Sequence, residues 1–301
     1  MEQYTIRSTL VIPLIVKGEV LGTLSFYYRT TPRAFTEAQI DFANKLATSI
    51  SLALGNAKLY EAERNIADTL QEALITMPDR IDGIEFGHLY RSATEATKVG
   101  GDFYDLFALE HGKVGVLVGD VAGKGLDAAA LTSVVKNAVK AHAYEDSTPA
   151  MILSKTNDLV AKISSPGEFV TMVFGVLDMA TGTLTYCSAG HPPAMIKRKE
   201  GGVELLGKHS PMIGAFSGIH YRSDKAVLNK GDILVLYTDG LIEARCNGGF
   251  FGEERLVKLL ANSGPIPAKE LPRLLIDTLT ECAGGKLADD TAILAVSLQN
   301  M

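Results

Sequence analysis

Hydrophobic and polar positions at the start of the chain predict a hairpin followed by one long helix. Two stretches rich in β-branched and apolar residues, 8–16 and 20–28, are separated by a Lys-Gly-Glu turn, the pattern of two antiparallel strands. A Thr-Glu-Ala-Gln sequence beginning at Thr36 has the form of a helix capping box. From there to about Ile75 the chain has no proline, and apolar residues recur at helical spacing until Pro78 ends the pattern.

This predicted helix is much longer than the average of about 10–14 residues. A small hairpin cannot cover the apolar face of such a helix, and Leu52, Leu59, Ile66 and Ala73 lie seven residues apart along it. We therefore interpret it as a connecting helix that pairs with a second copy of the chain as a short coiled coil. The alternative is that the helix packs back on its own chain.

Beyond Pro78 the pattern changes to strands interrupted by pairs of helices. Strands are expected at 84–92, 103–109, 114–119, 169–178, 183–189, 194–198, 221–228, 232–238 and 291–298, and helices at 126–143, 149–163, 252–261 and 268–282. Grouped strands with adjacent helix pairs indicate an α+β fold, because a Rossmann-type sheet would alternate strand and helix.

Composition narrows the possible functions. The 301 residues are 47% hydrophobic and 21% charged, with a net charge of −6, so the chain is globular and lacks the basic face that nucleic-acid binding requires. No apolar run approaches the roughly 18 residues of a membrane span, and the N-terminus lacks the features of a signal peptide. We expect a cytoplasmic protein with no membrane partner.

Because Cys187, Cys246 and Cys282 show no metal-ligand or CxxC spacing, we expect free or buried thiols.

The candidate chemistry lies in four aspartates, each at the edge of a predicted strand and most of them beside glycine. They are Asp102, Asp120, Asp239 and Asp289. Glycine permits tight turns and the close approach of an ion, and converging carboxylates repel one another unless a cation neutralises them. An all-oxygen ligand set favours Mg²⁺ or Mn²⁺ over zinc. Each motif is weak by itself, but the ordered set is a stronger signal.

The motifs GGDFYD, GDVAGKG, SAGHPP, TDGLIEA and DDTA, in this order, resemble those of the PPM metal-dependent protein serine/threonine phosphatases. They are most similar to the bacterial branch typified by sporulation protein E, which dephosphorylates regulators of sigma factors. The resemblance covers residues 79–301 and implies a β-sandwich of two antiparallel sheets flanked by helix pairs. The implied substrate is phosphoserine or phosphothreonine on a signalling regulator, by resemblance an anti-sigma-factor antagonist.

The first sixty residues or so resemble the C-terminal part of a GAF sensor domain. The matching residues include Val-Ile-Pro-Leu from Val11 and the segment from Phe35 to Tyr60. We therefore predict a partial GAF domain at 1–58 and a helical linker, a possible coiled coil, at 59–78. The front half of a GAF domain is absent, so we expect its usual ligand pocket to be incomplete.

The phosphatase resemblance also implies roles for individual residues. Two Mn²⁺ or Mg²⁺ ions would be held by four carboxylates and one main-chain carbonyl. These ligands are Asp102, Asp120, Val121, Asp239 and Asp289, with Asp120 bridging the ions and Asp102 bound directly or through water. Asp290 is an alternative to its neighbour Asp289. Asp105 is interpreted as a structural carboxylate that stabilises a turn.

Two positions depart from the type-2C pattern. Ala122 stands where those phosphatases carry a histidine that can protonate the leaving group, and His191 is a candidate replacement, although a Gly-His-Pro-Pro turn is more often structural. The phosphate-binding arginine also has no clear counterpart, and Lys124 and Arg91 are the candidates. Slow, partner-activated turnover is therefore expected.

Three other functions compete with this prediction. GGDFYD superficially resembles the GGDEF hairpin of diguanylate cyclases, but that reading leaves the later acidic motifs unexplained. A nuclease or phosphodiesterase gains nothing from an acidic surface. A non-catalytic, GAF-tethered scaffold that binds the same regulators has no need of four clustered carboxylates, whose repulsion lowers stability.

We also predict that deleting residues 1–76 changes the catalytic rate, because helix pairing can reposition the helices after Gly125.

Overall fold

The structure is a computed structural model that describes residues 6–75, 77–92, 100–123, 125–146, 148–165, 167–207, 209–246, 249–285 and 287–299. It divides into two compact units, residues 1–66 and 67–301, which are described separately below. Helix α1 (Glu37–Leu74) contributes residues to both units. The candidate phosphate-binding residue Lys124 lies outside the described residues.

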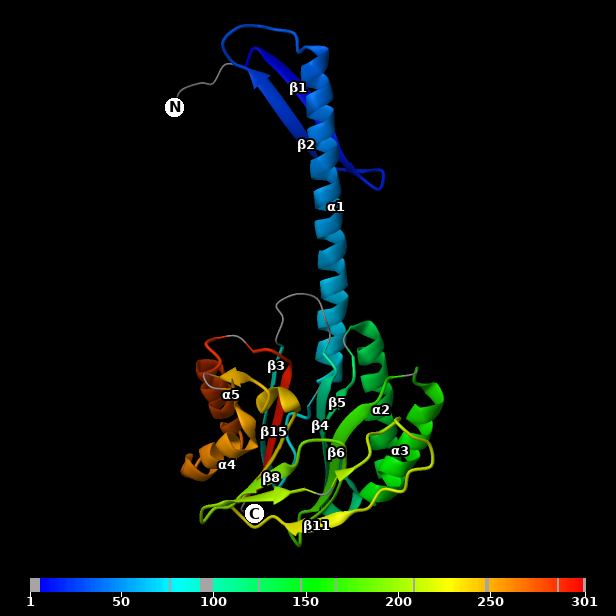
Figure 1. Cartoon of the computed structure of the whole chain (residues 1–301), viewed down its shortest axis with the longest axis vertical. Coiled ribbons are helices and arrows are strands. Elements are labelled where there is room, and N and C mark those ends of the chain that lie inside the picture. Colours follow the sequence, from blue (N-terminus) through cyan, green and yellow to red (C-terminus); the bar gives the residue numbers. More distant parts are fainter. Residues whose placement is uncertain are drawn as a thin grey trace. The chain divides into compact units, whose positions relative to one another are not determined.

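The first unit consists of an antiparallel hairpin and the N-terminal part of α1 (Figure 1). Strands β1 (Ser8–Val16) and β2 (Glu19–Tyr28) form the hairpin. The predicted capping box is confirmed: the Gln39 backbone N–H donates to Thr36 Oγ1 at 3.3 Å, and the Thr36 N–H donates to Gln39 Oε1 at 3.0 Å. Two of the four backbone N–H groups that a helix start leaves unpaired are thereby satisfied.

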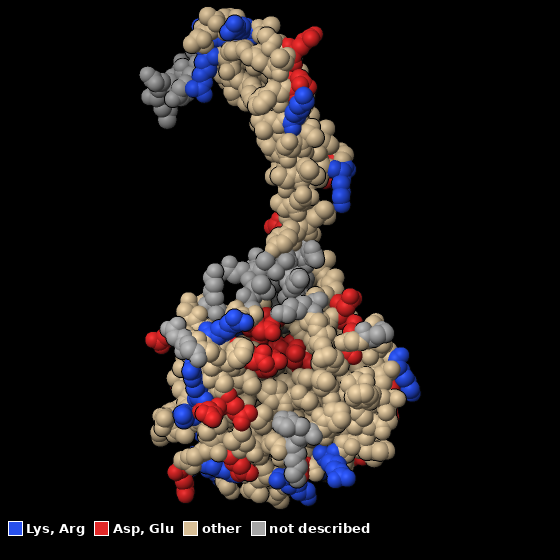
Figure 2. Space-filling model, viewed as in Figure 1, with Lys and Arg blue, Asp and Glu red and all other residues tan. Residues whose placement is uncertain are grey.

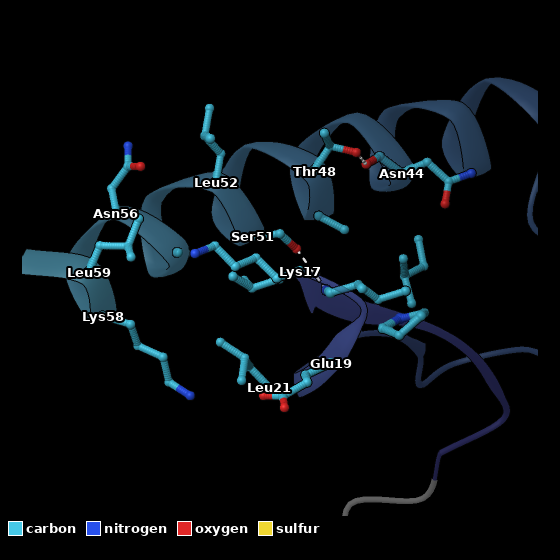
Figure 3. A pocket seen from close by; sticks show the side chains of 16 residues that line it. Lys17, Glu19, Leu21, Asn44, Thr48, Ser51, Leu52, Asn56, Lys58 and Leu59 are labelled. Carbon is cyan, nitrogen blue, oxygen red and sulfur yellow. Dashed lines mark hydrogen bonds between the residues drawn. The ribbon is translucent and has the colours of Figure 1, made fainter. Parts of the chain in front are cut away.

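The hairpin covers only part of the apolar face of α1. Ile12 and Leu14 of β1 pack against Ala43 and Ala47 of the helix. A groove of about 860 Å³ continues along the hairpin and the helix (Figure 3), lined mainly by apolar side chains together with Lys17, Glu19 and Lys58. The Ile15 N–H donates to Ser51 Oγ across it, at 3.0 Å (dashed in Figure 3).

Farther along α1, the apolar residues at seven-residue spacing lie on the surface. Leu52, Leu59 and Ile66 are 67%, 54% and 54% exposed. The helix therefore packs on its own chain near Ala43 and Ala47, and leaves Leu52, Leu59 and Ile66 largely uncovered. Although α1 has 38 residues, no helix within the described part of the chain combines the length and apolar character needed to cross a bilayer.

The second unit is built on two sheets. Among the described residues, six strands form the first sheet and five the second. The first has the order β10-β7-β6-β5-β4 with β11 also paired to β7, and contains β4 (Asp102–Leu109), β5 (Lys113–Val121), β6 (Val170–Asp178), β7 (Thr183–Ala189), β10 (His209–Ser210) and β11 (Asp224–Val227). The second has the order β3-β15-β12-β8-β9, and contains β3 (Ile84–Arg91), β8 (Ala194–Lys197), β9 (Val203–Leu206), β12 (Ile233–Tyr237) and β15 (Thr291–Leu298). The pairings are antiparallel except that of β10 with β7.

Alternating side chains give each sheet an inner and an outer apolar face. The inner faces pack together through residues such as Leu106 and Val116 of the first sheet and Leu234 and Leu294 of the second. Helices α2 (Leu126–Glu145) and α3 (Pro149–Ile163) cover the outer face of the first sheet, and α4 (Gly252–Asn262) and α5 (Leu271–Cys282) cover that of the second (Figure 1). The predicted α+β sandwich with flanking helix pairs is confirmed.

The sequence pattern missed the shortest elements. These are β9, β10, the two-stranded sheet of β13 (Arg245–Cys246) and β14 (Gly249–Phe250), and the short 3₁₀ helices Glu110–Gly112 and Asp239–Leu241. Segments of two to four residues are too short to show a period, so their formation depends on neighbouring chain. Strand β11 also begins three residues later than predicted, at Asp224, and α5 begins at Leu271 rather than 268.

One expectation about the cysteines was wrong. Cys246 and Cys282 form a disulfide, with their Cα atoms 5.1 Å apart, whereas Cys187 is buried and free as expected. The two bonded residues are separated by 36 positions, and the pairing arises because the β13–β14 sheet lies against the end of α5. Such a tertiary contact leaves no spacing signal in the sequence.

Candidate active site

Three of the four predicted aspartates meet where the two sheets come together at one end of the sandwich. Asp102 begins β4, and Asp120, near the end of β5, is its direct partner in the antiparallel register. Asp239 arrives from the other sheet, two residues after the end of β12. One carboxylate oxygen from each of the three residues lies within 4.8 Å of the others. Figure 2 shows acidic side chains gathered on one face of this unit.

The Gly-Gly pair before Asp102 makes room for this convergence. A Cβ atom on Gly101 would overlap the carbonyl oxygen of Val121 and lie 2.6 Å from Asp120 Oδ1. A Cβ atom on Gly100 would overlap the carboxylate of Asp290. Only glycine allows so close an approach of backbone to oxygen atoms. The Asp120 carboxylate and the Val121 carbonyl therefore both lie beside Gly101, and their role as metal ligands stays a prediction.

Thr238 fixes the orientation of Asp102 and was not among the site residues predicted from the sequence. Its hydroxyl donates to Asp102 Oδ2 at 2.7 Å, and the hydroxyl oxygen itself accepts the backbone N–H of Ala292 at 2.8 Å. One side chain thus connects the first sheet with both β12 and β15 of the second. The signal in the sequence was its position immediately before Asp239.

Burial and mutual repulsion make the charged forms of these aspartates unfavourable. Burial, followed by the negative charge of Asp120, raises the pKa of Asp102 well above its usual range. Burial, followed by the charge of Asp239, raises the pKa of Asp120 to about 7. Burial raises the pKa of Asp239, and the negative charge of Glu243 is the next largest cause. A divalent cation bound by these oxygens would remove this penalty, so the donor set fits a hard metal ion such as Mg²⁺ or Mn²⁺.

The fourth predicted residue, Asp289, lies at the edge of this cluster and is exposed. Its charge contributes to the raised pKa values of both Asp120 and Asp239. Its neighbour Asp290 is buried, accepts a hydrogen bond from the Ser92 hydroxyl at 3.0 Å, and also raises the pKa of Asp120. Both carboxylates are therefore near enough to affect the pKa of Asp120, and the choice of Asp289 as ligand stays a prediction.

Asp105 does not belong to the cluster. It lies on β4 on the side that faces the helices, where it is 3.6 Å from the ammonium groups of both Lys136 and Lys140 of α2. It also accepts the backbone N–H of Leu106 at 2.8 Å. The structure gives Asp105 a structural role, as the sequence analysis expected, but within a strand and through two lysines rather than in a turn.

His191 is buried between the sheets and does not open onto solvent. It is 2% exposed, its Nδ1 lies 2.9 Å from the hydroxyl of Thr171, and its Nε2 lies 3.1 Å from the carbonyl oxygen of Tyr237. Burial lowers the pKa of the imidazole to about 4, so the ring is neutral near pH 7. Both ring nitrogens are engaged and shielded from solvent, which argues against His191 as the leaving-group acid.

The remaining candidates are less constrained. Arg91 is exposed at the end of β3, opposite Thr291 in the register, which places its backbone near the acidic residues that precede β15. Its role in binding phosphate stays a prediction. The backbone N–H of Ala122 donates to the Phe169 carbonyl at 2.9 Å, and its methyl side chain has no proton to donate.

Comparisons with known proteins agree with this geometry. Residues 110–299 match the family model for stage II sporulation protein E (SpoIIE), and residues 1–54 match that for the GAF domain. The SpoIIE match includes Asp120, Asp239 and Asp289, whereas Asp102 precedes it.

Two curated relatives come from Bacillus subtilis. The phosphoserine phosphatase RsbU is 26% identical over 238 residues, which is 78% of this chain and 70% of RsbU. The phosphoserine phosphatase RsbP is 24% identical over 185 residues, covering 60% of this chain and 45% of RsbP. The chain therefore spans less than half of RsbP and a larger share of RsbU.

Solved structures show the same fold. The RsbU and RsbW domains of Rv1364c from Mycobacterium tuberculosis align with a TM-score of 0.65 and 28% identity, covering 75% of this chain and 62% of that one. The SiaA-PP2C domain of Pseudomonas aeruginosa aligns with a TM-score of 0.69 and 23% identity, covering 82% of this chain and all of that domain.

Proposed function

The chain belongs to the SpoIIE family, and we propose that it is a metal-dependent protein serine/threonine phosphatase that hydrolyses phosphoserine or phosphothreonine on a bacterial signalling regulator. The observation that carries this proposal is the convergence of Asp102, Asp120 and Asp239, with oxygens within 4.8 Å of one another, at the site where family resemblance expects two metal ions. Asp289 and the Val121 carbonyl complete the proposed ligand set.

The proposed cofactors are two Mn²⁺ or Mg²⁺ ions. Ions bound here would lower the pKa of a shared water and offset negative charge on the phosphoryl oxygens. The protein's own contribution is to hold the ligands in place before substrate arrives. Thr238 orients Asp102 through a 2.7 Å hydrogen bond, and the register of β4 with β5 places Asp120 opposite Asp102.

Neither Ala122 nor His191 can protonate the leaving group. Ala122 has no proton to donate, and His191 is neutral, buried and engaged at both nitrogens. We therefore propose that the leaving group takes its proton from water. Without a positioned acid, turnover should be slow, and we propose that an activating partner raises it.

The substrate class rests on the relatives. RsbU and RsbP are both named phosphoserine phosphatases, and the matched Mycobacterium tuberculosis structure joins an RsbU domain to an RsbW domain. We propose an anti-sigma-factor antagonist as the phosphoprotein. A cytoplasmic location follows from a substrate of this kind.

A homodimer through α1 is the second proposed partnership. Leu52, Leu59 and Ile66 are more than half exposed and repeat every seven residues, which is the spacing of a coiled-coil seam. Sedimentation of the full chain should show a dimer, and Leu59→Glu should shift it towards monomer. A wild type that sediments as a monomer at high concentration would contradict the dimer without affecting the phosphatase proposal.

The test of the activity is hydrolysis of p-nitrophenyl phosphate and of a phosphoserine peptide with Mn²⁺, with Mg²⁺ and with EDTA. We expect metal-dependent hydrolysis that is lost in Asp120→Ala and Asp239→Ala. The matched control is Asp277→Ala, an aspartate that is 69% exposed on α5 and should leave activity unchanged. Absence of hydrolysis with either metal, even with candidate regulators added, would favour the non-catalytic scaffold.

A further inference from the structure

The segment 190–193 crosses from one sheet of the sandwich to the other. Strand β7 of the first sheet ends at Ala189 and strand β8 of the second begins at Ala194, so these four residues make the whole connection. Two of them are prolines, whose rings fix the backbone φ angle. His191 is therefore presented from a short, stiff crossover into the space between the sheets.

The imidazole connects the two sheets through one hydrogen bond to each. The carbonyl oxygen of Tyr237 can only accept a hydrogen bond, so Nε2 carries the proton and donates over 3.1 Å. Nδ1 is then the acceptor, and the Thr171 hydroxyl donates to it over 2.9 Å. Because the ring is 2% exposed, bulk water does not compete for either contact.

Both partners of the imidazole lie directly beside the acidic residues. Thr171 of β6 is paired in register with Asp120 of β5. Tyr237 is the last residue of β12, two positions before Asp239. His191 thus bridges the strand next to one carboxylate and the end of the strand that leads to another.

We propose that His191 is a positioning residue that sets the separation of Asp120 and Asp239 and thereby the affinity of the centre for divalent metal. The proposal rests on the proposed function, because it needs these carboxylates to be metal ligands. Without bound metal they repel each other across the junction of the two sheets. A rigid bridge holds them at the distance at which one ion can bind both, so binding does not have to draw the sheets together.

His191 connects the sheets only while both of its hydrogen bonds are present, and this gives a specific test. His191→Asn places an amide near the position of Nδ1, which keeps a contact with Thr171 and removes the one to Tyr237. Thr171→Val removes the hydrogen bond to Nδ1 with little change of side-chain shape. Because loss of either hydrogen bond breaks the connection between the sheets, the double variant should bind Mn²⁺ no more weakly than the single variants. Independent effects of the two substitutions would instead add.

The measurement is Mn²⁺ binding to the full-length chain by titration calorimetry, together with the thermal midpoint of each variant. We expect each single variant to weaken Mn²⁺ binding by about tenfold, the equilibrium factor that corresponds to the free energy of one buried hydrogen bond, and the double variant to weaken it no further. The control is Asp232→Asn at the other end of β12, where Asp232 accepts hydrogen bonds from Arg198, Lys199 and Asn229. It should lower the thermal midpoint and leave Mn²⁺ affinity within about twofold, because its contacts lie far from the acidic residues.

The outcomes separate this proposal from the one on which it rests. Variants that lower the thermal midpoint but keep wild-type Mn²⁺ affinity would show a purely structural histidine and overturn the inference. If His191→Asn does not fold, Thr171→Val alone decides, since valine suits a strand. A wild type that binds Mn²⁺ but hydrolyses no phosphate ester would refute the proposed function and leave the test of the bridge intact. A wild type that binds no Mn²⁺ would overturn both.

Discussion

Replacing Asp120 with asparagine should stabilise the metal-free protein while abolishing metal binding. Burial and the neighbouring Asp239 raise the pKa of Asp120 from 3.8 to about 7. At about 1.4 kcal/mol per pKa unit, a rise of about three units corresponds to roughly 4 kcal/mol. Part of the side chain is in contact with solvent, which screens its neighbours, so we expect a gain of about 2–4 kcal/mol.

The sign of the effect follows from proton binding. A raised folded-state pKa means that the folded protein binds more protons than the unfolded chain between about pH 4 and pH 7. Stability of the wild type therefore falls as the pH rises through that window, and the full penalty is present above pH 7. The asparagine side chain carries no charge at any pH. The gain from Asp120→Asn should be complete at pH 8 and absent at pH 4.

The assay is urea-induced unfolding in EDTA at both pH values, with Asp105→Asn as the matched control. Asp105 is another aspartate of the first sheet and is buried, but Lys136 and Lys140 lie 3.6 Å from it. Its neutralisation leaves the buried ammonium of Lys136 short of a counter-charge, so we expect a loss of about 3 kcal/mol. The same chemical change should thus have opposite signs at two sites in adjacent strands.

Two results would refute this reasoning. If Asp120→Asn is no more stable than the wild type at pH 8 in EDTA, burial and the neighbouring carboxylates do not disfavour the charged form of Asp120 as its position implies. If the stability gain is the same at pH 4 and pH 8, it arises from packing and not from charge. Addition of Mn²⁺ supplies a further check, because it should stabilise the wild type and leave Asp120→Asn unchanged.

Three further outcomes are expected. Mn²⁺ affinity should rise with pH up to about 7, the pKa of Asp120, because the metal displaces protons from the carboxylates. Calorimetry in buffers of different ionisation enthalpy measures the protons released, and an affinity that does not change with pH would contradict the prediction. Asp289→Asn should weaken Mn²⁺ binding. Asp290→Asn should mainly lower the thermal midpoint, because the buried Asp290 accepts a hydrogen bond from Ser92. The reverse result would make Asp290 the metal ligand and Asp289 the structural residue. Reduction of the Cys246–Cys282 disulfide, which spans 36 residues, should destabilise the protein by about 2–4 kcal/mol, and an unchanged urea midpoint would argue against the bond.

The sequence predicts most of the sandwich because its strands and helices are long enough to show a period. Helix α3 begins at Pro149 and ends at Ile163 as predicted, since a proline is favoured in the first turn and the apolar residues recur at helical spacing. Strands such as β9 and β10 have no such internal signal. They form because the edge of an existing sheet offers unpaired backbone groups.

The acidic site was predictable in its members but not in its supports. Each aspartate lies beside a strand end, and Asp102, Asp120 and Asp239 also adjoin a glycine; these are local features. The bond from Thr238 to Asp102 joins residues 136 positions apart, and the bond from His191 to Tyr237 joins residues 46 apart. A single sequence contains no pattern for contacts of this kind. The same limit explains the missed disulfide and the two lysines of Asp105.

The arrangement of charges also bears on the choice between an enzyme and a scaffold. A domain that only binds a regulator would become more stable if one of Asp102, Asp120 and Asp239 were neutral. Yet their pKa values are all raised, and glycine, a threonine hydroxyl and the strand register hold them close together. Elsewhere in the same sheet, Asp105 is neutralised by lysines, so the fold does pair a buried carboxylate where only stability is at stake. Within the described residues, these three carboxylates have no ion pair with a lysine or arginine, and the fold still positions them close together. Such an arrangement suits the binding of a divalent cation, and this favours the phosphatase over the scaffold.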